Sequence, residues 1–243
     1  MKLRLDQLLV ERNLATDLDN ARALILAGEV YAQDAVSDKV GVLLDTNVSI
    51  RLKQKCPFVS RGGLKLAGAL SEFNQSVENL ICLDIGASTG GFSDCLLQNG
   101  AKQVYAIDVA YGQLAWKIRQ DSKVKVLERF NARKITPSDI DHAPVQLAVM
   151  DVSFISLTKI LPALFEVFPE DVAIIALVKP QFELPKSDIG PGGVVTDPDL
   201  HDKAINKIQA FVEDNGFKVS GVITSPILGP KGNTEFLIHI TSA

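Results

Sequence analysis

Four ionisable residues that lie far apart in the sequence could form one reactive site: Lys65, Asp151, Lys179 and Glu235. Each stands in a short stretch that is typical of a strand end, a turn or a helix start. A single parallel sheet could bring the last three to one crevice, because the ends of its strands meet at the same edge. Two lysines and two carboxylates in a crevice can activate a hydroxyl group.

A turn of small residues lies between the first two of these positions. The apolar run 80–85 leads into Gly86-Ala87-Ser88-Thr89-Gly90-Gly91, where small residues would let a ligand approach the backbone. In a doubly wound sheet, a ligand binds beyond the carboxyl ends of the strands, and an acid after the second strand binds ribose hydroxyls. Asp108 occupies that place, so the loop predicts a site for a nucleoside-bearing cofactor.

The spacing of the glycines favours one cofactor over others. It reads G-x-x-x-G-G rather than the G-x-G-x-x-G of dinucleotide sites, and Asp84 precedes the first glycine. A carboxylate there disfavours a pyrophosphate and suits the positively charged S-adenosylmethionine; a dinucleotide and a merely tight turn are the alternatives. Asn131 either approaches the adenine or caps a helix. The expected cofactor-binding residues are Asp84, Gly86, Ala87, Ser88, Gly90, Gly91, Asp108 and Asn131.

From about residue 60 the chain alternates strands with helices, which predicts a doubly wound α/β sheet. Apolar runs predict strands at 80–85, 103–108, 124–128, 145–150, 172–178, 217–225 and 234–240. Helices are expected at 91–99, 114–120, 156–168 and 198–215.

A small α+β module precedes this sheet. Leucines at helical spacing predict a first helix, and a second begins at Thr16, where Asp19 completes a variant of the capping box. Residues 29–33 and 47–53 alternate like strands. We therefore expect a small domain over residues 1–58 and a larger one over residues 59–243.

Basic residues gather near the boundary between the two. The net charge of −4 argues against a uniformly basic nucleic-acid surface, yet no acidic residue occurs between Thr46 and Ser71. A solvated strand and linker would explain this stripe, but we favour an electrostatic contact with phosphates. The stripe contains Arg51, Lys53, Lys55, Arg61 and Lys65.

Composition excludes several classes of protein. With 243 residues and 47% hydrophobic content, the chain can bury a sizeable core. Its longest strongly apolar run is far shorter than the roughly 20 residues of a spanning helix, and no secretory signal is evident. We expect a soluble, cytoplasmic protein without membrane insertion. The three cysteines lack a Cys-x-x-Cys pair and the three histidines are scattered, so neither a disulfide nor a metal site is expected.

Five motifs occur in order along the chain: S-R-G-G-L-K-L, D-I-G-A-S-T-G-G-F, D-V-S-F-I-S-L, A-L-V-K-P-Q-F-E and G-N-T-E-F-L. They resemble the haemolysin A (TlyA-type) family, whose catalytic domain is similar to the FtsJ-type ribose 2′-O-methyltransferases. The resemblance implies a Rossmann-like, seven-stranded, S-adenosylmethionine-dependent domain that methylates a cytidine ribose in ribosomal RNA, either free or in ribosomal subunits. The family's Lys-Asp-Lys-Glu tetrad falls on Lys65, Asp151, Lys179 and Glu235.

The first segment resembles the S-four RNA-binding module in R-L-D-Q-L-L-V, A-R-A-L-I-L-A-G-E-V and the strand ending R-L-K. That family usually carries several basic residues at the start of its second helix. Here residues 16–22 read T-D-L-D-N-A-R, so that only Arg22 remains. Arg22 joins Arg51, Lys53, Lys55 and Arg61 as the expected RNA contacts.

In such an enzyme the tetrad must act on the hydroxyl, because a sulfonium methyl is already activated. Neutral Lys179 would accept the hydroxyl proton, whereas charged Lys179 would stabilise an alkoxide. Asp151 would orient Lys179, Glu235 would hold one lysine, and Lys65 would orient the hydroxyl or contact phosphate. The alternatives are an ion-pair cluster without chemistry, a membrane-active haemolysin, and a non-catalytic rRNA-binding assembly factor.

Overall fold

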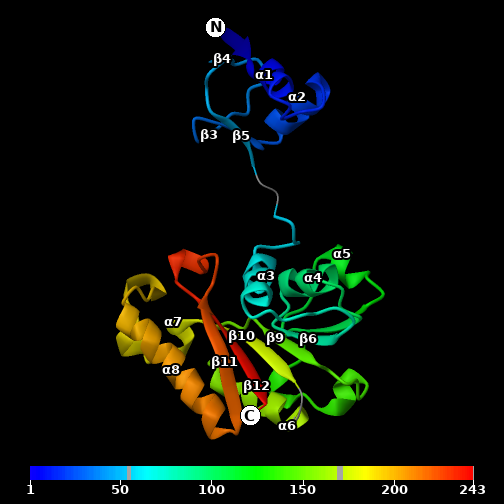
Figure 1. Cartoon of the computed structure of the whole chain (residues 1–243), viewed down its shortest axis with the longest axis vertical. Coiled ribbons are helices and arrows are strands. Elements are labelled where there is room, and N and C mark those ends of the chain that lie inside the picture. Colours follow the sequence, from blue (N-terminus) through cyan, green and yellow to red (C-terminus); the bar gives the residue numbers. More distant parts are fainter. Residues whose placement is uncertain (54–55, 169–171, 243) are drawn as a thin grey trace. The chain divides into compact units, whose positions relative to one another are not determined.

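The computed structural model describes residues 1–53, 56–168 and 172–242, and the chain divides into two compact units (Figure 1). The first unit spans Met1–Lys55 and the second Cys56–Ala243. Each unit has its own buried core, so each is described separately.

The first unit is a small α+β module built around two helices. Leu5, Leu9 and Ile25 from these helices are fully buried against Val30. The strands form an antiparallel pair β1–β4 and an antiparallel three-stranded sheet in the order β3-β2-β5. In chain order the elements are β1 (Lys2–Arg4), α1 (Leu5–Glu11), α2 (Leu18–Leu26), β2 (Val30–Ala32), β3 (Ala35–Val36), β4 (Leu43–Asp45) and β5 (Ile50–Leu52).

The second unit alternates strands and helices, as the sequence predicts. Its helices are α3 (Gly62–Glu72), α4 (Gly91–Gln98), α5 (Trp116–Arg119), α6 (Leu161–Val167), α7 (Pro180–Glu183) and α8 (Pro198–Asp214). Its strands are β6 (Ile81–Ile85), β7 (Gln103–Ile107), β8 (Val124–Leu127), β9 (Leu147–Met150), β10 (Ala173–Val178), β11 (Phe217–Thr224) and β12 (Phe236–Ser242). Short 3-10 turns η1 to η6 cover Ala132–Lys134, Pro137–Ile140, Leu157–Lys159, Lys186–Asp188, Pro191–Gly193 and Pro230–Gly232.

All seven strands join one sheet in the order β11-β12-β10-β9-β6-β7-β8. Strand β12 is antiparallel to both of its neighbours, and the pairings from β10 to β8 are parallel. The expectation of seven strands in a doubly wound α/β sheet is confirmed, with boundaries that shift by one or two residues.

Helices cover both faces of this sheet (Figure 1), and alternate residues of each strand supply the two cores. Leu147 and Val149 of β9 pack with residues of α3 and α4, whereas Ala148 and Met150 face the core that contains α6 and α8. Both faces are therefore buried, which leaves the edge formed by the strand ends for a ligand.

Three elements differ from those expected. Lys65, which we expected in a basic linker, lies in helix α3, an element that was not predicted. The second helix begins at Leu18, because Asp17 rather than Thr16 caps it by accepting a hydrogen bond from the Asn20 backbone N at 2.8 Å. The helix expected at 156–168 is divided into η3 and α6.

Candidate active site

Three of the four predicted residues lie at one edge of the sheet because of strand direction. Asp151 directly follows β9 and Lys179 directly follows β10, so both stand at carboxyl ends of parallel strands. Glu235 directly precedes β12, and this antiparallel strand begins where β10 ends, with Phe236 paired to Val178. The reversed direction of β12 thus brings Glu235, in the fifth motif, to the same edge.

The four side chains form a connected set of ion pairs. Lys179 Nζ lies 2.6 Å from Asp151 Oδ1, and Lys65 Nζ lies 2.6 Å from Glu235 Oε2. Lys65 Nζ also lies 3.8 Å from Asp151 Oδ2, which joins the two pairs. The side chains of Lys65, Lys179 and Glu235 are buried, and that of Asp151 is 22% exposed. The structure therefore brings together all four residues named from the sequence.

Lys65 reaches this cluster from helix α3 rather than from a linker. Its place in the first turn depends on a close approach between the starts of α3 and α4. A Cβ on Gly91 would overlap the Ser60 hydroxyl and lie 2.9 Å from the Gly63 backbone N. Only glycine at position 91 allows the starts of α3 and α4 to lie this close. This close packing places Lys65 of α3 at the sheet edge.

Glu235 is fully buried, and a glycine makes room for it. A Cβ on Gly229 would overlap the Glu235 carboxylate, so the turn before η6 can close over that group only without a side chain. Glu235 Oε1 has no hydrogen-bond partner within the described ranges. Sequence reasoning missed Gly229, because nothing in its local pattern shows this contact.

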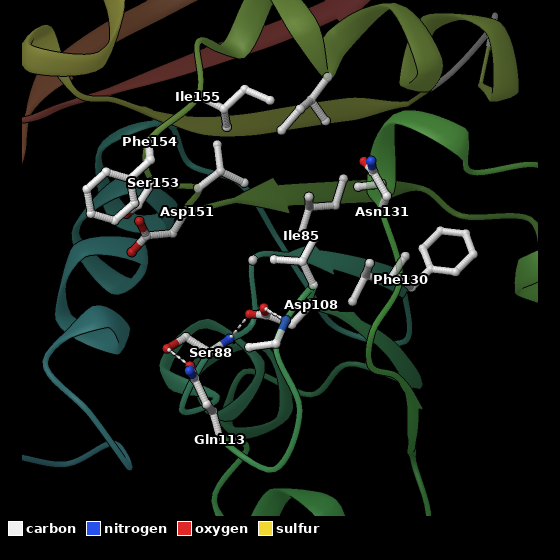
Figure 2. A pocket seen from close by; sticks show the side chains of 17 residues that line it. Ile85, Ser88, Asp108, Gln113, Phe130, Asn131, Asp151, Ser153, Phe154 and Ile155 are labelled. Carbon is white, nitrogen blue, oxygen red and sulfur yellow. Dashed lines mark hydrogen bonds between the residues drawn. The ribbon is translucent and has the colours of Figure 1, made fainter.

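A cavity of about 350 Å³ opens beside Asp151 at the ends of β6 and β7 (Figure 2). Asp108 Oδ2 accepts a hydrogen bond from the Ser88 backbone N at 2.7 Å, and its Oδ1 accepts one from the Ala110 backbone N at 2.7 Å. Apolar side chains complete much of the wall, including Ile85, Ile107, Phe130, Ile155 and Ile160. Size and lining are those of a site for a small organic ligand.

A second cavity, of about 580 Å³, contains the lysine side of the cluster. Lys65, Lys179, Arg61 and Ser60 line it, together with the 227–230 turn. Gly86, Ser88, Asp151 and Ser153 line both cavities, so the two meet at the Asp151 carboxylate. Ligands bound in the two cavities would come into contact beside that group.

Most of the predicted cofactor-binding residues line one or both cavities. Asp108 and Asn131 line the first, Ala87 and Gly91 line the second, and Gly86 and Ser88 line both. Gly90 lies outside both walls; it has a φ of +92° and immediately precedes α4. Asn131 also caps η1 by accepting a hydrogen bond from the Arg133 backbone N, so the capping interpretation is confirmed, whereas a contact with adenine stays a prediction.

Asp84 lies in β6 below the cavity and is fully buried. Its Oδ2 accepts a hydrogen bond from the Ser93 hydroxyl at 2.6 Å, and its Oδ1 has no partner within the described ranges. Burial raises the pKa of Asp84 to about 7. Asp84 thus links β6 to the first turn of α4 and does not form part of either cavity wall.

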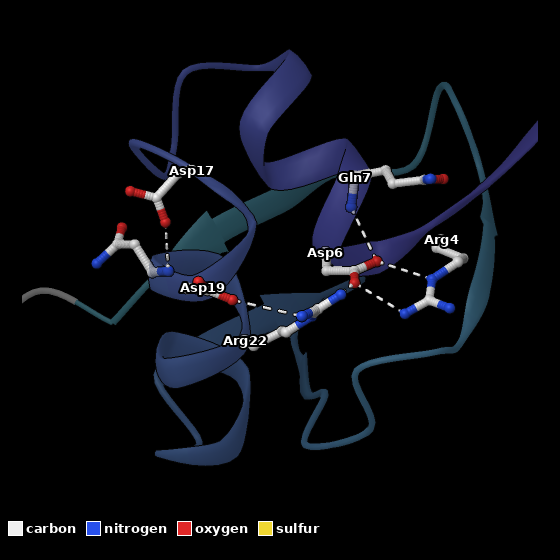
Figure 3. Close-up of polar contacts among 7 residues, drawn as sticks. Arg4, Asp6, Gln7, Asp17, Asp19 and Arg22 are labelled. Atoms are coloured by element: carbon white, nitrogen blue, oxygen red, sulfur yellow. Dashed lines mark hydrogen bonds and ion pairs between the residues drawn. The ribbon is translucent and has the colours of Figure 1, made fainter.

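In the first unit, aspartates already pair with several of the expected RNA contacts. Figure 3 shows Arg22 beside Asp6 at 3.5 Å and Asp19 at 3.4 Å, with Asp6 also held by Arg4 at 2.8 Å. Arg51 stacks over Tyr31 and lies 3.3 Å from Asp34.

The basic stripe divides between the two units. Lys53 is exposed in the first, and Arg61 is exposed in the second, where it lines the lysine-side cavity. Lys55 lies outside the described residues. Buried Lys65 therefore does not belong to an exposed stripe.

Two further classes of site find no support among the residues that the structure describes. They contain no cluster of three His, Cys, Asp or Glu side chains able to hold a metal ion. None of their helices has the length and apolar character needed to cross a bilayer.

Comparisons with known proteins agree with this architecture. Residues 58–242 match the family model of the FtsJ-like methyltransferases. A Mycobacterium tuberculosis protein named 16S/23S rRNA (cytidine-2′-O)-methyltransferase TlyA is 45% identical over 241 residues, covering 98% of this chain and 90% of its own. Hemolysin A of Brachyspira hyodysenteriae is 43% identical over 238 residues, covering 98% and 99%.

A solved structure from Streptococcus thermophilus, named after the hemolysins, covers 100% of this chain and 89% of its own, with 45% identity and a TM-score of 0.77. Sequence and architecture point the same way, since the matched region contains the seven-stranded sheet, both cavities and all four clustered residues. The chain therefore belongs to the FtsJ-like methyltransferases, and within them to the group that includes TlyA and hemolysin A.

Proposed function

We propose that the protein transfers a methyl group from S-adenosylmethionine to the 2′-hydroxyl of a cytidine ribose in ribosomal RNA. The observation that carries the proposal is that the two cavities adjoin at Asp151. Lys65 and Lys179 both pair with Asp151 and line the second cavity. A methyl donor in the first cavity, the donor cavity, and a ribose in the second, the acceptor cavity, would be neighbours there. Relatives named as rRNA (cytidine-2′-O)-methyltransferases support the choice of acceptor.

The residues of the first cavity fit S-adenosylmethionine. A Cβ on Gly86 would lie 2.5 Å from the Asp151 carbonyl oxygen, so this turn leaves the backbone bare at the cavity wall. Asp108 would accept hydrogen bonds from the ribose hydroxyls, and Asn131 with Phe130 would contact the adenine. The bound donor supplies an activated methyl group, which leaves activation of the acceptor oxygen to the protein.

The cluster in the second cavity is suited to that activation. Lys179 Nζ is fixed by Asp151 and by the Ser153 hydroxyl at 2.8 Å, so its position relative to the junction is defined. In its neutral form it would accept the hydroxyl proton; in its charged form an N–H would stabilise the negative charge that develops on the oxygen. Lys65, held by Glu235, would orient the hydroxyl or contact a neighbouring phosphate.

The first unit supports RNA as the acceptor. We assign this unit, Met1–Lys55, as an S-four-like RNA-binding module, with Arg22, Arg51 and Lys53 as its phosphate contacts. Arg61 in the larger domain would add a contact at the acceptor cavity, where it lies among the lining residues. Ribosomal RNA as acceptor would locate the reaction in the cytoplasm.

Transfer of label from the donor tests the proposal. The protein is incubated with methyl-labelled S-adenosylmethionine and, separately, with ribosomal subunits and with free rRNA. Label in 2′-O-methylcytidine after digestion to nucleosides supports the assignment. Label on a base would assign a different methylation, and donor binding without transfer to any RNA would favour the non-catalytic assembly factor.

A further inference from the structure

Glu183 is a buried carboxylate near the lysine cluster that none of the roles above uses. It ends α7, four residues after Lys179, and is 4% exposed. Its Oε1 accepts a hydrogen bond from the Leu157 backbone N at 2.8 Å, and its Oε2 accepts from the Ser156 hydroxyl. Lys207 Nζ lies 3.2 Å from the same Oε2. Burying a carboxylate is costly unless it is paired and hydrogen-bonded, and these donors provide that compensation.

The contacts of Glu183 join three separate parts of the fold. Ser156 and Leu157 follow β9, Glu183 follows β10, and Lys207 projects from α8. Lys207 Nζ also donates to the Glu183 backbone carbonyl at 2.6 Å, which holds the end of α7 as well as its side chain.

Together with the Asp151–Lys179 ion pair, Glu183 joins segment 151–157 to segment 179–183 as a closed ring beside the acceptor cavity. The first closure is the ion pair between Asp151 and Lys179 at the strand ends, and the second is the Glu183 bond to Leu157. Between the two closures, the rings of Phe154 and Phe182 lie 5.0 Å apart. Segments 151–157 and 179–183 are therefore tied to each other at both ends.

Phe154 lies at the outer turn of this ring in a strained conformation. Its backbone φ is +63°, a value that residues other than glycine rarely adopt. The residue is 90% exposed and lies at the wall of the first cavity. Such a conformation is unfavourable and persists only where the surroundings fix it. The Glu183 contacts hold the end of the same segment, at Ser156 and Leu157.

We propose that Glu183, with Lys207 as its partner, is a positioning residue that holds Asp151 and Lys179 in the arrangement the acceptor requires, and Phe154 at the wall of the first cavity. The inference rests on the proposed function, because it concerns the acceptor side of the same site. Glu183 contacts neither the glycine turn after β6 nor Asp108 after β7. Segment 151–157 does line part of the first cavity, so loosening Glu183 should weaken donor binding somewhat and impair methyl transfer much more.

Glu183→Gln and Lys207→Met in the full chain test this role. A shift of about 1 Å in a reacting group can cost about 10²-fold in rate, so we expect single-turnover methyl transfer to fall by about 10- to 100-fold. Donor Kd, measured by calorimetry, should rise by a much smaller factor than the rate falls, because Gly86, Ser88 and Asp108 stay in place. Amide hydrogen exchange at Leu157 should accelerate in both variants, and Lys207→Arg should recover most of the rate.

Lys203→Met is the matched control, because it removes an ion pair of the same helix, from Lys203 to Asp188 at 2.6 Å, away from the ring. Equal losses for Lys203→Met and Lys207→Met, or a donor Kd that rises in step with the loss of rate, would overturn the inference. Unchanged exchange at Leu157 in both variants would overturn it too. Failure of the unmodified protein to methylate any RNA would instead refute the proposed function, and exchange at Leu157 would still decide whether Glu183 fixes the segment.

Discussion

Lys179 is the side chain on which the proposed chemistry depends most. Its Nζ lies 2.6 Å from Asp151 and its side chain is 8% exposed, yet the residue lines the acceptor cavity and not the donor cavity. General acid–base groups contribute about 10²- to 10⁴-fold, so we expect Lys179→Ala to lower single-turnover methyl transfer by at least about 10²-fold. Donor affinity by calorimetry should hardly change.

Lys186→Ala removes an exposed lysine of η4 and serves as the control for Lys179→Ala. We expect it to leave methyl transfer unchanged. A Lys179→Ala protein that transfers methyl at the rate of the unmodified protein would contradict any chemical role for Lys179.

Asp84 gives the stability of the fold a defined pH dependence. Burial raises its pKa from 3.8 to about 7, so between these values the folded protein binds a proton that the unfolded chain lacks. The free energy of unfolding contributed by this group therefore decreases as pH rises through that window and is constant above it, with a slope of at most about 1.4 kcal/mol per pH unit.

Asp84→Asn should remove this trend, so that the variant gains stability relative to the unmodified protein as pH rises from about 4 to about 7. Urea unfolding at a series of pH values measures it. Ser93→Ala should make the pH dependence of stability stronger. The Ser93 hydrogen bond lowers the pKa of Asp84, so its loss should raise that pKa further. Parallel stability curves for the unmodified protein and Asp84→Asn would show that Asp84 does not titrate in this range.

At the scale of elements, apolar runs were sufficient to predict the seven strands, because both faces of this sheet are buried. The antiparallel place of β12 follows from pairing with β10 and β11, which a single-strand pattern does not contain. Helix α3 was missed because Gly62 and Gly63 suggest a turn, although Leu66, Ala69 and Leu70 do mark a buried helical face. Glu183 lies within a motif noted from the sequence, but its role depends on Leu157, a contact 26 residues away in the chain.

The crossing of α3 and α4 can be tested at Gly91. Its Cβ would overlap Ser60 and lie 3.2 Å from the Gly62 Cα, and backbone cannot yield as a flexible side chain can. Overpacking of this kind costs about 1–3 kcal/mol, so Gly91→Ala should reduce the free energy of unfolding by about that amount in denaturant titrations. Methyl transfer should also fall, because a displaced α3 carries Lys65 with it.

Gly62→Ala is the stability control, since a Cβ at that position meets nothing closer than Ser60 Oγ at 3.5 Å. Alanine in a helix is favoured over glycine by about 0.5–1 kcal/mol, so this variant should be as stable as the unmodified protein or more stable. A Gly91→Ala protein of unaltered stability would mean that the two helices do not need their close approach.

At the scale of the whole molecule, many basic side chains are already paired with carboxylates and so offer less charge to RNA. The two lysines and two carboxylates at the sheet edge balance one another, so the cluster presents no net charge to a polyanion. In the first unit, Arg4 and Arg22 share the buried Asp6, which reduces what they offer to phosphate (Figure 3). Lys53, and Arg51, whose partner Asp34 is itself exposed, therefore become the main candidates for holding RNA in that unit.

Salt dependence of RNA binding tests that assignment. Removal of one basic side chain that binds a phosphate should reduce the slope of log K against log salt concentration by about 1, so Arg51→Ala/Lys53→Ala should reduce it by about 2. Methyl transfer at saturating RNA should be retained, because neither residue belongs to the second unit. Lys218→Ala is the control, since this exposed lysine lies near the start of β11, at the opposite end of the sheet from the strand ends that bear the site. An identical slope for the double variant and the unmodified protein would assign RNA binding to other residues.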